Sequence, residues 1–344
     1  MTELIMPELR KDPVVDRWVI IAAQRGKRPT DFKTTARRRE SESCPFCPGN
    51  ENLTPPEVLV NRDRDTRPNS PGWQLRVISN KYPALKIEGQ LRRQGEGIFD
   101  KMSGIGAHEV IIETPEHRFD LVDLPLEQVR NVFWAYRERM LDLRKDIRFK
   151  YVMVFKNQGE AAGASLEHAH SQLIATPVVP KRVHEELEGA LRHYQYKERC
   201  LFCDIIHEEL RQKDRVVAET EHFVALAPFA PRFPFETWVL PRNHANCYFE
   251  IPDSELPDLA KMFKLLLAKL RVALSDPPYN YSLHTDTLLC EAREHYHWHF
   301  EVIPKITNIA GFEWGTGFYI NPVAPEVAAD YLRKIEIDSV KSPA

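Results

Sequence analysis

The apolar residues of this chain recur with helical spacing in two segments, one in each half of the sequence. In both segments a large apolar side chain returns every three or four residues, which places these side chains on one stripe of an α-helix. The first stripe consists of Val129, Val132, Phe133, Tyr136, Met140 and Leu143, and the second of Leu259, Phe263, Leu266 and Leu270. We therefore predict two long amphipathic helices that pack against a core.

Strand-like runs surround each predicted helix in the same order. One run precedes each helix, at 109–117 and 236–244, and another follows it, at 151–155 and 279–283, before a strand that carries a His-x-His sequence. This repetition predicts an α+β fold of two duplicated half-domains, each a mainly antiparallel sheet with packed helices. The segment 177–181, Pro-Val-Val-Pro-Lys, interrupts the pattern, so we place the halves at residues 1–180 and 181–344. The stretches 54–73 and 89–106, rich in Arg, Asp, Pro and Gly, are expected to be loops.

Composition narrows the class of protein. The 344 residues are 43% hydrophobic and 28% charged, which is enough to bury a large core. A net charge of −3 argues against a nucleic-acid-binding surface, and no run approaches the roughly 18 apolar residues of a membrane span. We expect a cytoplasmic protein. Its six cysteines are too few for a disulfide scaffold, and Cys247 and Cys290, which lie in no motif, are expected to be ordinary buried residues rather than ligands.

The other four cysteines belong to a pattern of metal ligands that occurs twice. Each copy has a Cys-x-x-Cys pair, a distant histidine and the first histidine of a His-x-His, a combination typical of tetrahedral zinc sites. The copies are Cys44, Cys47, His117 and His168, and Cys200, Cys203, His244 and His297. We predict zinc at the first set and a second ion at the other, where a redox-active pair at Cys200 and Cys203 is the alternative.

The second histidine of the first His-x-His is then available for chemistry. Alternate residues of a strand share a face, so His168, His170 and Gln172 are expected to project together. A metal bound at His168 would hold His170 in place, and a neutral imidazole can attack phosphorus to form a covalent intermediate. The amide of Gln172 could stabilise the oxygen that gains charge. A plain surface or core pair of histidines is the alternative, which the upstream cysteines disfavour.

Several segments of the chain together resemble the galactose-1-phosphate uridylyltransferase family, the transferase branch of the histidine-triad superfamily. The resemblance covers nearly the whole chain and rests on segments 17–21, 25–29, 44–50, 79–85, 155–157, 167–172 and 310–313. It implies two histidine-triad-like halves, a homodimer, nucleotide-sugar and sugar 1-phosphate substrates, and structural zinc. It also implies that His170 is the uridylylated nucleophile and that Gln172 contacts the transferred phosphoryl group. The implied substrate-binding residues are Arg25, Arg28, Asn80, Asn157, Gly163, Ser165, Gly311, Phe312 and Glu313.

The reaction that this resemblance implies is a ping-pong transfer in galactose metabolism. UDP-glucose would give UMP to His170, and a hexose 1-phosphate would then accept it. The segment 314–322, however, lacks a glutamine that well-studied members use to bind the hexose phosphate. It looks more like the branch that includes an ADP-glucose phosphorylase, which is our alternative. A hydrolase and a non-enzymatic zinc scaffold are further alternatives for the function. A scaffold protein would still function without His170, whereas the enzyme would not.

The second half is expected to be catalytically silent. His299 stands where His170 stands in the first half, but Phe300 and Glu301 follow it in place of Ser and Gln. A carboxylate at that place would repel a phosphate. Some family members hold their second metal with a glutamate and three histidines, so Glu186, His284, His297 and His299 form the alternative to the second Cys2His2 set.

Overall fold

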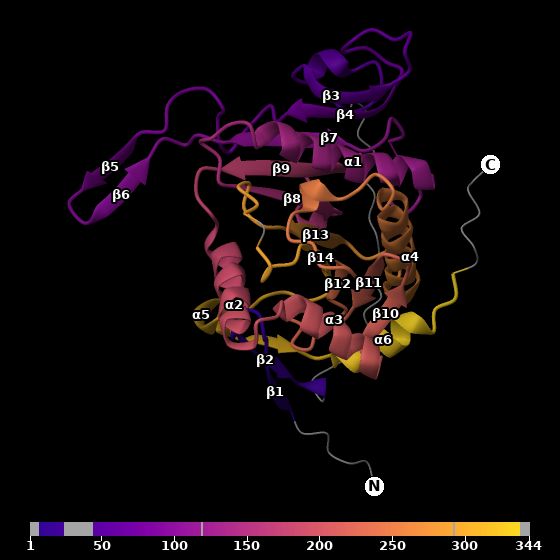
Figure 1. The fold of residues 1–344 in the computed structure, drawn as a ribbon. Helices are drawn as coiled ribbons and strands as arrows, with labels where there is room; N and C mark the ends of the chain where they lie inside the picture. The colour runs from indigo at the N-terminus through magenta and orange to yellow at the C-terminus, as the bar shows by residue number, and fades with distance from the viewer. Residues whose placement is uncertain (1–6, 24–43, 118–119, 292, 338–344) are drawn as a thin grey trace.

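A single antiparallel sheet runs through the centre of the computed structural model, which describes residues 7–23, 44–117, 120–291 and 293–337. Every neighbouring pair of its ten strands is antiparallel. The strands follow one another across the sheet (Figure 1) in the order β10 (Val216–Glu219), β11 (Phe223–Leu226), β12 (Thr237–Pro241), β14 (His299–Pro304), β13 (Tyr279–His284), β8 (Tyr151–Gln158), β9 (His170–Thr176), β7 (Ala107–Ile112), β4 (Trp73–Ser79) and β3 (Glu57–Arg62).

The strand order shows the internal duplication. The first half contributes β8, β9, β7, β4 and β3, and the second contributes β13, β14, β12, β11 and β10, in matching order outward from the β8–β13 pair. The two predicted helices are α1 (Leu126–Leu143) and α4 (Leu256–Leu274), and their apolar stripes meet in one core, where the rings of Phe133 and Phe263 lie 4.8 Å apart. The predicted α+β fold of two duplicated half-domains is confirmed.

Some elements were not expected from the sequence. The stretch 54–73 contains β3, and 89–106 contains the hairpin β5 (Arg93–Glu96) and β6 (Phe99–Met102), which projects from the body in Figure 1. Both predictions of loops were wrong because these strands lie at an edge or outside the main sheet, where charged side chains are tolerated and hide the alternation. Outside the main sheet, the described part of the chain also forms α2 (Lys181–Lys197), α3 (Leu201–Gln212), α5 (Gly311–Thr316), α6 (Pro325–Arg333) and a small sheet of β1 (Glu8–Lys11), β2 (Trp18–Ile21) and β15 (Tyr319–Asn321).

The N-terminal strands pack against the second half of the chain. Strand β2 pairs with β15, and the turn between β1 and β2 crosses α2 at Gly189. A Cβ at Gly189 would lie 1.7 Å from the carbonyl oxygen of Val14, so only glycine allows this crossing.

Cys247 and Cys290 form a disulfide, with their Cα atoms 6.1 Å apart. The bond joins the start of the short helix η5 (Tyr248–Glu250) to the loop that follows β13. The expectation that these were ordinary buried cysteines was therefore wrong. They are 43 residues apart and belong to no motif, so their proximity is a product of the tertiary fold alone.

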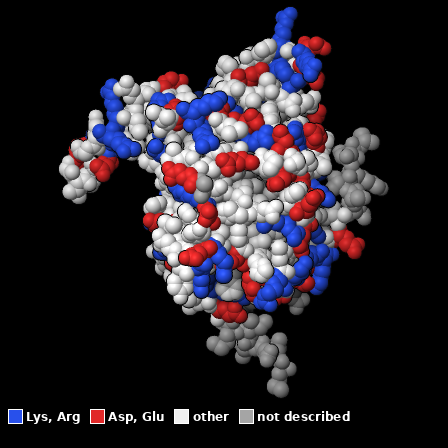
Figure 2. Space-filling model, in the orientation of Figure 1, with Lys and Arg blue, Asp and Glu red and all other residues white. Residues whose placement is uncertain are grey.

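Charged side chains of both signs are scattered over the face of the molecule in Figure 2. On the face drawn in Figure 2, Lys and Arg are interspersed with Asp and Glu over the described residues. None of the helices in the described ranges of the chain has both the length and the apolar composition of a membrane span.

Candidate active site

The first cysteine and histidine set comes together beside the start of β9. The Sγ of Cys47 lies 3.3 Å from Nδ1 of His117 and 3.6 Å from Nδ1 of His168, and the Sγ of Cys44 lies 3.7 Å from the latter atom. Ligand atoms around a tetrahedral metal are roughly 3.3–3.8 Å apart, so the four side chains could hold one ion. Nε2 of His168 faces the carbonyl oxygen of Thr114 at 2.7 Å, which leaves Nδ1 directed to the two cysteines, where it could bind a metal.

A small apolar cluster attaches this set to the sheet. It consists of Cys44, Phe46, Trp73, Ile78, Val110 and Ile112. Val110 and Ile112 lie opposite Gln172 and His170 in the β7–β9 pair, so the cluster is on the nucleophile's side of the sheet. Ser171 points to the other side, where its Oγ accepts a hydrogen bond from the Tyr136 hydroxyl of α1 at 2.7 Å.

His170 is held as a neutral imidazole with a defined tautomer. Its Nδ1 lies 2.8 Å from the carbonyl oxygen of His168 and donates to it, so the lone pair is on Nε2. Burial lowers the pKa of His170 to about 4, and the Lys156 ammonium adds to this effect. The ring packs edge-on against Phe46, with the centroids 5.4 Å apart. Nε2 of His170, which has no hydrogen-bond partner among the described residues, is a nucleophile that could attack phosphorus.

Lys156 supports the backbone of His170 from the other face of the sheet. Its Nζ donates to the carbonyl oxygen of His170 at 3.3 Å and to a carboxylate oxygen of Glu113 at 2.6 Å, and both side chains are fully buried. Through these two bonds Lys156 links β8 to the residue that follows β7 and to the first residue of β9. Only the tripeptide 155–157 was recognised in the sequence, and its buried lysine was given no role.

We predict that Lys156→Met destabilises the protein by about 3–5 kcal/mol, because it leaves the Glu113 carboxylate buried without its partner. Denaturant unfolding would measure this loss. The double variant Lys156→Met with Glu113→Leu is the control, and it should recover most of the stability because it removes both charges. A single variant within about 1 kcal/mol of the wild type would contradict the prediction.

The structure brings most of the expected nucleotide-binding residues of the first half to this site. Phe155 lies opposite Gln172 in the β8–β9 pair, and Asn157 is two residues further along β8, so Asn157 is on the same face as Gln172. Gly163 has φ +90°, and a Cβ there would lie 3.7 Å from Nδ2 of Asn157. Ser165 is exposed on the loop that runs from Gly163 to His168. Asn80 comes directly after the end of β4.

Asn280 of β13 is a residue of this region that the sequence did not point to. Its Nδ2 donates to Oδ1 of Asn157 and to the carbonyl oxygen of Ala162, each at 2.8 Å. The second half therefore orients a side chain of the first half's site. Asn280 belongs to no motif, so no signal in the sequence marked it.

The predicted residues near the C-terminus do not join this site within one chain. Gly311, Phe312 and Glu313 begin α5, which Figure 1 shows beside the lower end of α2 and well away from β9. Phe312 is exposed there. Arg25 and Arg28 lie outside the described residues.

The second cysteine and histidine set repeats the geometry of the first. The Sγ of Cys203 lies 3.4 Å from Nδ1 of His244 and 3.7 Å from Nδ1 of His297, and Cys200 completes the group. Nε2 of His297 lies 2.9 Å from the carbonyl oxygen of Pro241, just as His168 faces Thr114. His297 therefore belongs to the Cys2His2 set.

The alternative ligands Glu186, His284 and His299 also lie together, without His297. The Nδ1 of His284 is 2.9 Å from a carboxylate oxygen of Glu186. Burial would lower the pKa of His284, but the carboxylates of Glu186 and Glu301 outweigh burial and raise it. Glu186 and His284 thus form a buried ion pair beside a neutral His299. This arrangement does not require a metal.

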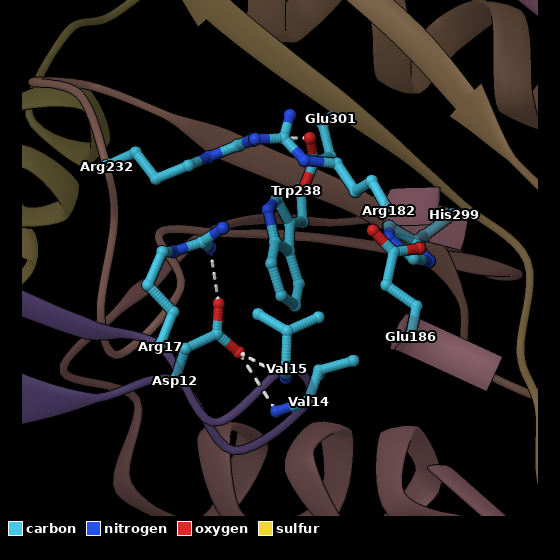
Figure 3. A pocket seen from close by; sticks show the side chains of 10 residues that line it. All are labelled: Asp12, Val14, Val15, Arg17, Arg182, Glu186, Arg232, Trp238, His299 and Glu301. Atoms are coloured by element: carbon cyan, nitrogen blue, oxygen red, sulfur yellow. Dashed lines mark hydrogen bonds and ion pairs between the residues drawn. The ribbon is translucent and has the colours of Figure 1, made fainter. Parts of the chain in front are cut away.

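The place in the second half that corresponds to that of His170 in the first is a small pocket, and paired charged side chains line it (Figure 3). His299 has its Nδ1 3.2 Å from the carbonyl oxygen of His297, as His170 has with His168. Glu301, two residues on, is paired with the guanidinium of Arg232, and Arg17 is paired with Asp12 at 2.6 Å. Burial would raise the pKa of Glu301, but Arg232 and the nearby histidines outweigh burial and lower it. Glu301 therefore stays an anion beside His299.

Sequence comparison identifies related families. A model described as the N-terminal domain of galactose-1-phosphate uridyl transferase matches residues 1–180. A second model, described only as a domain of unknown function, matches residues 127–338.

Individual relatives match over almost the whole chain. An ADP-glucose phosphorylase of Arabidopsis thaliana is 40% identical over 96% of this chain and 93% of its own length. A galactose-1-phosphate uridylyltransferase of Thermotoga maritima is 33% identical over 97% of this chain and 100% of its own. The crystal structure of an Arabidopsis thaliana ADP-glucose phosphorylase with bound ADP-glucose is similar in fold, with a TM-score of 0.82 and 38% identity over 97% of this chain and 100% of that one.

Proposed function

Because the chain belongs to the galactose-1-phosphate uridylyltransferase family, we propose that it transfers a nucleotidyl group through a covalent intermediate on Nε2 of His170. The observation that carries this proposal is the hydrogen bond from Nδ1 of His170 to the His168 carbonyl, which leaves Nε2 free on a buried, neutral ring. His299 has a similar backbone hydrogen bond, and what distinguishes His170 is the neutral amide of Gln172 two residues on, where the second half has the Glu301 carboxylate.

The reaction has two displacements at one phosphorus. Nε2 of His170 attacks the α-phosphorus of a nucleoside diphosphate sugar, a P–N bond forms, and the bond to the bridging oxygen breaks to release the sugar 1-phosphate. An oxygen of the acceptor phosphate then attacks the same phosphorus, the P–N bond breaks, and the imidazole is restored. The amide of Gln172 donates to the phosphoryl oxygen that gains charge, and Asn157, oriented by Asn280, lies on the same face to bind the nucleotide.

We favour ADP-glucose as the donor and inorganic phosphate as the acceptor, so that the products are glucose 1-phosphate and ADP. Three facts support this choice. The relative named ADP-glucose phosphorylase is 40% identical, against 33% for the uridylyltransferase of Thermotoga maritima. A structure 38% identical to this chain contains ADP-glucose. Finally, the segment after Glu313 lacks the expected glutamine. Uridylyl transfer from UDP-glucose to galactose 1-phosphate is the second candidate, because that relative matches 97% of the chain.

We also propose that both Cys2His2 sets hold zinc, which supplies structural cross-links and no step of the reaction. Thiolate and imidazole donors suit this ion. The expected homodimer remains a proposal, in which α5 of a second copy would bring Gly311, Phe312 and Glu313 to the site. The boundary between residues 180 and 181 and a cytoplasmic location likewise remain predictions.

Intact-protein mass spectrometry tests the function. The protein is incubated separately with ADP-glucose and with UDP-glucose, and the adduct is then challenged with phosphate or with galactose 1-phosphate. We expect an AMP-sized adduct that phosphate discharges to ADP. A UMP-sized adduct discharged only by galactose 1-phosphate would move the assignment to the uridylyltransferase. No adduct with either donor would refute covalent transfer from these substrates.

A further inference from the structure

His108 of β7 contacts the side chain that would stabilise the transferred phosphoryl group. Val110 lies opposite Gln172 in the β7–β9 pair, so His108, two residues away on the same face, is its diagonal neighbour. Nε2 of His108 is 2.9 Å from Oε1 of Gln172. No motif in the sequence includes His108.

The other ring nitrogen of His108 decides which atom carries the proton. The backbone N–H of Ala84 donates to Nδ1 of His108 at 3.1 Å, and a backbone amide can only donate. Nδ1 is therefore the acceptor, and the proton of the neutral imidazole is on Nε2. His108 consequently donates to Gln172, and this bond requires the oxygen of the Gln172 amide to face the imidazole. The amide nitrogen of Gln172 is left without a partner among the described residues and available to the substrate.

The same imidazole is adjacent to a residue expected to bind the nucleotide. The backbone N–H of Asn80 donates to the carbonyl oxygen of His108 at 2.7 Å, and Nδ2 of Asn80 lies 3.1 Å from Nε2 of His108. Because that ring nitrogen carries a proton, it does not accept from Asn80. Oδ1 of Asn80 already accepts the backbone N–H of Tyr82 at 2.8 Å, so the amide nitrogen of Asn80 is left without an acceptor among the described residues.

We propose that His108 is a positioning residue that holds the amide of Gln172 with its N–H donors toward the transferred phosphoryl group. This inference rests on the proposed function. Without the imidazole donor the amide of Gln172 can rotate and present its oxygen, which would repel the oxygens of the phosphoryl group. The loss should fall on formation of the covalent intermediate, because charge develops on those oxygens in the transition state.

The test measures single-turnover formation of the nucleotidyl-histidine adduct and the equilibrium affinity for the donor sugar nucleotide. His108→Phe keeps a flat ring without the donor, and we expect the adduct to form about 10–100-fold more slowly, with donor affinity changed less than about 3-fold. His108→Gln supplies an amide N–H near the position of Nε2 and should recover much of the rate. Unfolding temperature and metal content are recorded for each variant, and His108→Leu, which also lacks the donor, carries the test if His108→Phe does not fold.

The double variant distinguishes positioning from an independent role. Once Gln172→Ala has removed the amide, His108→Phe should cause little further loss. An equal further loss in that background, a loss confined to donor affinity, or an unchanged rate in His108→Phe would overturn the inference. Absence of any adduct in the wild-type protein would instead refute the proposed function, and this inference with it.

Discussion

Replacing His170 by alanine is expected to abolish the covalent adduct and to lower turnover by about 10⁴-fold or more. The reason is that no other described side chain offers a free imidazole lone pair at the start of β9, where the ring is oriented by the His168 carbonyl and supported by Lys156. Adduct mass and steady-state rate would be measured on protein whose metal content and unfolding temperature match those of the wild type.

His299→Ala is the matched control for this prediction, because His299 occupies the corresponding place on β14 with a similar backbone hydrogen bond. The ring is buried near Trp238 and His284, so its removal should cost about 2–4 kcal/mol of stability. Transfer by the folded protein should persist, since Glu301 is an anion where Gln172 stands in the first half. If His299→Ala removed the adduct as completely as His170→Ala, the assignment of catalysis to the first half would be wrong.

Cys44→Ser should remove one equivalent of zinc per chain and lower the free energy of unfolding by about 3–5 kcal/mol or more. It should also reduce nucleotidyl transfer, because the set that includes Cys44 holds His168, whose carbonyl orients the nucleophile. Metal analysis, denaturant unfolding and the adduct assay measure the three effects.

Cys200→Ser provides the comparison, since it alters the equivalent ligand of the second set. We expect it to lose the other equivalent of zinc and a similar amount of stability, while transfer per folded molecule changes less than about 10-fold. Wild-type protein with a single equivalent of zinc would contradict the second site. Equal loss of transfer in both variants would contradict the separation of roles.

The repeated patterns of the chain were enough to predict its framework. Two apolar stripes at helical spacing identified α1 and α4, and the runs around them identified β7, β8, β12 and β13. These predictions succeeded because helical and strand periodicity is a local property, which burial on one face imposes on neighbouring residues. The β5–β6 hairpin escaped notice because its strands are exposed on both faces and carry no such pattern, and β3 because it is partly buried on both faces, so its apolar residues do not alternate.

For the candidate site too, some residues could be predicted from the sequence and others only from the tertiary structure. Ligand types and spacing within the sequence pointed to the two Cys2His2 sets and to His170 and Gln172, since these residues must be of a given chemical kind wherever the chain places them. The partners of those residues were decided only by tertiary structure. His108 reaches Gln172 through a strand pairing, Asn280 reaches Asn157 from the other half, Arg232 pairs with Glu301, and Cys247 bonds to Cys290. Each contact joins residues far apart in sequence whose types are common in any chain, so their meaning arises from proximity, and proximity is set by how the two halves pack on one sheet.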